Sequence, residues 1–119
     1  MLRNVFIALG LVVVISAVPA AQTAPTLTIV NQASDEATVK VVGPSAGFVQ
    51  VVSGGQQTVA LTGGVYELKI RYCNPRGCTF TRTDRFVLTQ TPSAVSRATV
   101  TLHAAGGNLG EQPISPSEY

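Results

Sequence analysis

Residues 65–72, VYELKIRY, constrain the fold of this chain more than any other segment. Apolar and charged residues alternate along it, and a period of two predicts a β-strand with one face in a core and the other in solvent. The inward side chains are Tyr66, Leu68, Ile70 and Tyr72, and the outward ones are Glu67, Lys69 and Arg71. Beyond the N-terminal segment, Val and Thr dominate and no helical run forms, so the chain is predicted to be all-β.

Six further segments are predicted to be strands: residues 26–30, 37–42, 47–52, 58–62, 85–89 and 98–103. Turn-forming residues separate the strands, at 31–35, 43–45, 53–55, 63–64, 74–77 and 91–93. About seven short strands at near-regular spacing are typical of a single antiparallel β-sandwich of the immunoglobulin-like kind. We therefore expect one domain over residues 26–103, followed by a flexible Gly-, Pro- and Ser-rich tail over residues 104–119.

The N-terminus has the layout of a secretory signal peptide. A short start containing Arg3 leads into the uncharged apolar run 5–18, and Pro19, Ala20 and Ala21 provide a small-residue exit. We expect residues 1–20 to form a signal peptide helix that is cleaved after Ala20. A retained membrane anchor is the alternative, but this run is shorter than the roughly 20 residues that span a bilayer. The prediction is a secreted or periplasmic protein with no membrane span after cleavage.

The charge of the mature chain excludes several partners and activities. Loss of Arg3 leaves seven of the eight basic side chains against six acidic ones, which gives no drive to bind nucleic acid or anionic membrane in bulk. The single histidine, His103, lies at an outward position of the last predicted strand, and the acidic residues form no recognisable catalytic motif. We expect no enzyme activity and no cofactor.

Both cysteines lie in the segment RYCNPRGC, residues 71–78. In an oxidising compartment two cysteines predict one disulfide, Cys73–Cys78. A zinc site needs about four ligands, and a thioredoxin-type pair needs two intervening residues rather than four, so neither metal nor redox chemistry is expected. The disulfide would close a hairpin-like loop with Arg76 at its tip. This candidate recognition loop consists of Asn74, Pro75, Arg76 and Gly77, with Gly77 supplying any positive φ that the turn needs.

Basic residues gather around this loop. They form a candidate basic face of Lys69, Arg71, Arg82 and Arg85, for which a protein or an anionic surface polymer is the expected partner. An ordinary solvated strand face is the alternative. Because Tyr66 and Tyr72 point to the opposite side of their strand, no platform of interleaved aromatic and basic residues is expected here.

The pairing beyond Cys78 carries an electrostatic conflict. If Cys73 opposes Cys78 directly, Lys69 faces Arg82 and Glu67 faces Asp84. Like charges directly opposite each other destabilise a sheet. We therefore expect an irregular stretch around residues 81–84, with regular pairing resuming near Arg85 or Phe86.

The middle of the chain, SGGQQTVAL at 53–61 and GGVYEL at 63–68, resembles small bacterial transthyretin-like sandwiches such as PEGA-type and carboxypeptidase-regulatory-like domains. The shared pattern is a glycine turn, a Thr/Val strand, a second glycine turn and a G-x-Y strand entry. This resemblance implies a seven-stranded sandwich of accessory or binding character, usually without catalytic residues.

Three functions remain open from the sequence. The first is a non-catalytic accessory or binding module. The second is a self-assembling surface or filament subunit, a homo-oligomer in which residues 22–25 or 106–119 add a strand to a neighbour's sheet edge. The third is a secreted protease inhibitor that presents the Arg76 loop.

Overall fold

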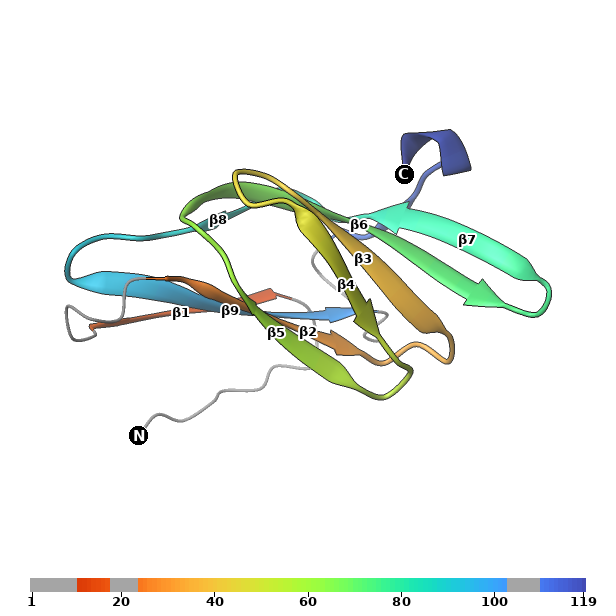
Figure 1. The fold of residues 1–119 in the computed structure, drawn as a ribbon, viewed down its shortest axis with the longest axis horizontal. Coiled ribbons are helices and arrows are strands. Elements are labelled where there is room, and N and C mark those ends of the chain that lie inside the picture. The colour runs from red at the N-terminus through yellow and green to blue at the C-terminus, as the bar shows by residue number, and fades with distance from the viewer. Residues whose placement is uncertain (1–10, 18–23, 103–109) are drawn as a thin grey trace.

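The computed structural model describes the backbone of residues 11–17 and the complete residues 24–102 and 110–119. They form two β-sheets that pack face to face, so the predicted all-β sandwich is confirmed (Figure 1). Sheet A has the order β1-β9-β2-β5, and its strands are β1 (Leu11–Ala17), β9 (Ala94–Leu102), β2 (Thr26–Asn31) and β5 (Gln56–Ala60). One pair departs from the expected antiparallel arrangement, because β2 runs parallel to β9.

Sheet B has the order β10-β7-β6-β3-β4, and β8 also pairs with β6. Its strands are β10 (Gln112–Pro113), β7 (Gly77–Arg82), β6 (Gly64–Asn74), β3 (Glu36–Val42), β4 (Gly47–Val51) and β8 (Phe86–Leu88). A short 3-10 helix, η1 (Pro116–Glu118), follows β10. All seven predicted strands are present, with shifted ends, and β7, β10 and β1 are additional.

The core lies between the sheets and is built by the alternating positions of their strands. Leu27 and Ile29 of β2 and Val100 of β9 meet Val39 of β3 and Ile70 of β6, and all five are fully buried. The four inward residues predicted for residues 65–72 are buried as expected: Tyr66, Leu68, Ile70 and Tyr72. The outward positions of the same strand remain on the opposite face of sheet B.

Asn31 fixes the point where the chain crosses from sheet A to sheet B. Its side chain is fully buried, and Nδ2 donates to the main-chain oxygens of Asp35 (2.9 Å) and Val51 (3.0 Å). Its Oδ1 accepts a hydrogen bond from the Ala33 N–H at 2.9 Å. Burial without such partners would cost several kcal/mol, so these bonds specify the turn predicted at residues 31–35.

The predicted signal peptide helix is wrong for residues 11–17. These residues form β1, which pairs antiparallel with β9 from Leu11 opposite Val100 to Ala17 opposite Ala94. The segment is rich in β-branched residues, which favour strands wherever an unpaired edge is available. Residues 1–10 and the predicted cleavage site at Ala20 lie outside the described residues. No helix among the described residues is long and apolar enough to cross a membrane.

The predicted flexible tail is wrong for residues 110–119. Gln112 and Pro113 pair antiparallel with Arg82 and Thr81 of β7, and the Ile114 N–H donates to the Phe80 oxygen at 2.9 Å. Composition suggested a tail too polar to fold alone, but this segment binds to the edge and outer surface of sheet B instead. Residues 103–109, which include His103 and the start of the predicted tail, lie outside the described residues.

The other proposed donor segment, residues 22–25, does not form a free arm in its described part. Residues 24 and 25 lead into β2, and the Leu61 N–H donates to the Pro25 oxygen at 2.9 Å.

Candidate recognition face

The cysteine loop is a disulfide-closed hairpin. Cys73 and Cys78 are bonded and lie directly opposite each other on β6 and β7, with a Cα–Cα distance of 4.1 Å. Asn74 pairs with Gly77, whose φ of 137° is positive as predicted, and the Asn74 Oδ1 accepts a hydrogen bond from the Arg76 N–H at 2.8 Å. The tip of this hairpin is exposed. On the chain-entropy model, a loop this short stabilises the fold by roughly 2 kcal/mol.

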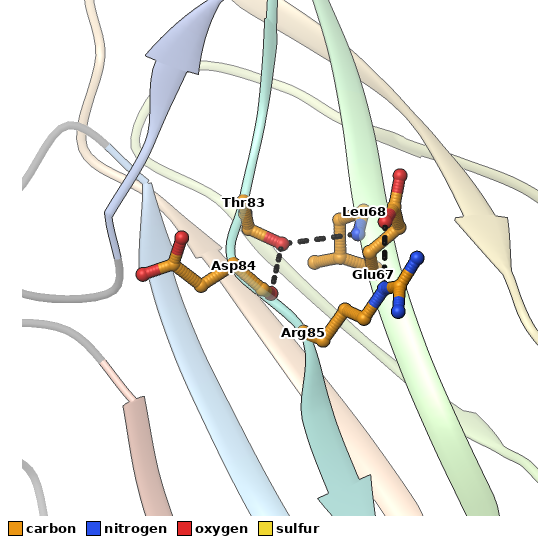
Figure 2. Close-up of polar contacts among 5 residues, drawn as sticks. All are labelled: Glu67, Leu68, Thr83, Asp84 and Arg85. Atoms are coloured by element: carbon orange, nitrogen blue, oxygen red, sulfur yellow. Dashed lines mark hydrogen bonds and ion pairs between the residues drawn. The ribbon is translucent and has the colours of Figure 1, made fainter.

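The expected interruption after β7 is present. Lys69 pairs with Arg82, the ladder then stops, and pairing resumes where Phe86 opposes Tyr66. Thr83 bridges the gap, because its N–H donates to the Leu68 oxygen at 2.9 Å and its Oγ1 accepts from the Leu68 N–H at 3.0 Å. This arrangement keeps the Leu68 backbone paired although the strand is broken (Figure 2).

The break also changes which charge meets Glu67. Arg85, rather than Asp84, reaches it, with 3.6 Å between Arg85 Nε and Glu67 Oε1. Figure 2 shows the Asp84 side chain pointing away from Glu67. The arginine side chain is 80% exposed, so this ion pair contributes little to stability.

The face of sheet B that points away from sheet A, which we call the outer face, carries most of the predicted basic residues. The strand registers place Lys40, Lys69 and Arg82 in one row across β3, β6 and β7. Arg71 lies in the next row, between Thr38 and Phe80. Three like charges in a row are unfavourable unless hydrogen-bond acceptors or anions lie beside them.

The C-terminal segment supplies acceptors to this row. Lys40 Nζ donates to the main-chain oxygen of Tyr119 at 2.8 Å, and Lys69 Nζ donates to that of Glu118 at 2.6 Å. The pKa of Glu118 is lowered, chiefly by its hydrogen bond from the Ser115 N–H and to a lesser extent by the nearby Arg82 and Lys69. The Glu118 carboxylate thus lies near the basic row, while its hydrogen bonds are made with Ser115.

Aromatic side chains complete the outer face. The Tyr119 ring lies between Phe80 of β7, with 5.3 Å between ring centroids, and Phe48 of β4, at 6.4 Å. Lys40 Nζ is 5.7 Å and Arg71 Cζ 5.9 Å from the centroid of the same ring. We call these four residues, Phe48, Phe80, Lys40 and Arg71, the aromatic cradle. The Tyr119 hydroxyl donates to the Thr38 oxygen at 3.1 Å, so the ring is held on its faces and at its tip.

A second anchor holds the segment where it passes the edge of β7. The hydroxyls of Tyr72 and Thr81 both donate to Glu111 Oε2, at 2.5 and 2.6 Å. Burial raises the pKa of Tyr72 well above its ordinary value, and the Glu111 carboxylate raises it further. Since Tyr72 and Thr81 lie on the inner side of the sheet and Tyr119 on the outer face, the segment wraps around β7.

The structure thus brings together part of the predicted basic face. Lys69, Arg71 and Arg82 share the outer face, whereas Arg85 lies beyond the break in β7 beside Glu67. The expectation that no aromatic–basic platform forms is wrong. Tyr66 and Tyr72 do point inward, but Phe48 and Phe80 supply the aromatic rings from neighbouring strands.

Sequence reasoning missed Lys40, Phe48, Phe80 and Tyr119. The outward phase of Lys40 was readable from Val39 and Val41, its inward neighbours, but its partners depend on the strand order. Within the described residues, no group of three or more His, Cys, Asp and Glu side chains is arranged to hold a metal ion.

No protein-family model, curated protein or solved structure matches this chain.

Proposed function

We propose that this protein is an exported, non-catalytic β-sandwich binding module whose recognition site is the outer face of sheet B. The observation that supports this most is the way the face holds residues 110–119. Strand pairing at β7 orients an extended peptide, basic side chains bind its main-chain oxygens, and the aromatic cradle takes one ring. Addition of a strand at a sheet edge combined with a side-chain pocket is a recurring mode of peptide recognition.

The chemistry of the face indicates the class of ligand. A peptide with an acidic residue next to an aromatic residue would suit this face, because its main-chain oxygens can accept from Lys40 and Lys69, its carboxylate lies near the basic row and its ring enters the aromatic cradle. The segment 110–119 then acts as a built-in occupant with which an external peptide competes.

Two further observations support export. The Cys73–Cys78 disulfide is of the kind that persists in oxidising compartments, and the N-terminal sequence has the three parts of a signal peptide. The resemblance of residues 53–68 to transthyretin-like accessory domains points to the same class of function.

Peptide titration of two forms of the full-length protein tests this proposal. The probe is a labelled synthetic peptide of residues 110–119, GEQPISPSEY, followed by fluorescence anisotropy. In the Tyr119→Ala variant the protein's own segment lacks its ring, so the outer face is more accessible. In the unmodified protein that segment competes at an effective concentration on the order of millimolar.

We expect the peptide to bind the variant at least about tenfold more tightly than the unmodified protein, and a control peptide ending in Ala to bind neither. Equal affinity for the two peptides, or no binding to the variant up to millimolar peptide, would refute the outer face as a recognition site.

A further inference from the structure

The outer edge of β9 is covered by a segment that the sequence predicts to be removed. β9 has β2 on one side and β1 on the other, and β1 covers residues 94–100 of its outer edge. All of β1 lies within residues 1–20, the expected signal peptide. If export removes that peptide, as proposed above, β9 becomes an unpaired edge strand nine residues long.

The hydrogen bonds that β9 makes on the side away from β1 show which of its main-chain groups would be exposed by removal of β1. The Ser96 N–H donates to the oxygen of Thr89, just after β8, and the Leu102 oxygen accepts from the N–H of Gln32, just after β2. Both residues therefore direct their main-chain groups to the side of β9 opposite β1. Main-chain groups alternate sides along a strand. The residues that face the vacated edge are therefore the odd-numbered ones, Val95, Arg97, Thr99 and Thr101.

This edge lacks the usual protection against pairing. Natural edge strands carry proline, lysine, bulges or short lengths that discourage addition of another strand. β9 is long, is rich in Val and Thr, and has Arg97 as its one charged residue. The antiparallel β1 shows that the edge accepts a strand in that direction.

We propose that the exported protein forms a homodimer in which two β9 strands pair antiparallel about a two-fold axis at Ala98. This register overlaps all of residues 94–102 and places edge-facing residues opposite edge-facing residues. Arg97 then lies opposite Thr99 of the partner subunit, and Val95 lies opposite Thr101 of the partner subunit. The two copies of sheet A become one continuous sheet.

Alternative registers of the same pair are less favourable. An axis at Arg97 places two arginines directly opposite each other, which is unfavourable. An axis at Thr99 shortens the overlap to residues 96–102. A shift of the register by one residue places the edge-facing main-chain groups of one β9 opposite residues of the other β9 whose main-chain groups point toward β2. The same shift moves the side chains of one strand to the opposite face of the joined sheet. β9 is thus complementary to itself, as an interface with two-fold symmetry requires.

The test begins with the full chain expressed with its own leader and recovered from the exported fraction. Intact mass gives the N-terminus, and light scattering across a dilution series gives the dimer dissociation constant. Two variants of Thr99 test this register, because each Thr99 lies opposite Arg97 of the partner subunit and the dimer therefore contains this pair twice. Thr99→Glu places opposite charges together and Thr99→Lys places like charges together.

We expect a protein that begins at residue 21 and dimerises. Thr99→Glu should lower the dissociation constant about fivefold and Thr99→Lys should raise it about fivefold, since two cross-strand charge pairs change together. The circular dichroism spectrum serves as the folding control for both variants.

Three results would overturn the proposal. The first is an intact mass that retains residues 1–20, because β1 would then still cover the edge of β9. The second is a cleaved protein that stays monomeric at all concentrations, and the third is a dimer that both variants change in the same direction or leave unchanged. The last two results would leave the peptide site on sheet B untouched, because that site lies on the other sheet.

Discussion

Replacing Tyr119 by alanine should weaken the docking of the C-terminal segment on the outer face while leaving the sandwich folded. The lost interactions are contacts of the ring with the aromatic cradle and the hydrogen bond from the hydroxyl to the Thr38 oxygen. An aromatic pair is worth about 0.5–1.5 kcal/mol, an exposed cation–π contact about 0.5–1 kcal/mol and a hydrogen bond about 0.5–1.5 kcal/mol. Because the ring is partly exposed, we take the combined loss as about 2 kcal/mol.

Amide hydrogen exchange at Ile114 measures this loss directly, because its N–H bonds to the Phe80 oxygen when the segment is docked. A loss of about 2 kcal/mol in local opening free energy should speed exchange about thirtyfold. The matched control Tyr119→Phe keeps the ring and loses the hydroxyl, so about fivefold is expected. If Ile114 exchanges at the unmodified rate in Tyr119→Ala, the cradle does not hold the segment and the reasoning fails.

Two further predictions concern the backbone break and the second anchor. Thr83→Val removes the acceptor of the buried Leu68 N–H, so it should lower the free energy of unfolding, measured by urea titration, by about 1–3 kcal/mol. The exposed control Thr79→Val should change that free energy by less than about 0.5 kcal/mol. Equal urea midpoints for the two variants would contradict the hydrogen bond between Thr83 and Leu68. Because the pKa of Tyr72 is raised in the folded protein, the stability that it contributes is complete below the ordinary pKa of about 10 and declines as pH rises above it. Tyr72→Phe should therefore lose less stability than the unmodified protein between about pH 9.5 and 11.5, and parallel curves would argue against the raised pKa.

Local sequence patterns were sufficient for seven of the ten strands in the described residues and for the two faces of residues 65–72. The period of two in residues 65–72 placed Tyr66 and Leu68 in the core correctly. If Cys73 and Cys78 are directly opposite, Lys69 must face Arg82. The structure contains that pair, and the pairing of β6 with β7 ends there as expected. Both inferences rest on short-range geometry, which a single strand or hairpin already determines.

The outer face depended on information that no single strand carries. Lys40 and Phe48 join Lys69 because β3 lies between β4 and β6, and strand order follows from packing of the whole chain. The segment 110–119 reads as disordered from composition, because its side chains have no core to enter. They bind one by one to a surface that the rest of the sandwich provides.

The secondary structure of residues 11–17 was predicted wrongly for a related reason. A run such as LVVVISA suits both an export signal and a strand, and composition does not distinguish them. In the structure the strand forms because the edge of β9 offers unpaired backbone groups.

The parallel pairing of β2 with β9 has a consequence for the timing of folding. Thr26 lies opposite Arg97, so the centre of sheet A joins the two ends of the domain. The neighbours in sheet B are hairpins, with β3 beside β4 and β6 beside β7, and these close over short loops. Contacts between distant residues form slowly because a long loop must be ordered before they contribute. The β2–β9 pairing at the centre of sheet A therefore cannot be completed until the ribosome has synthesised residue 102, so sheet A is expected to close after the hairpins of sheet B.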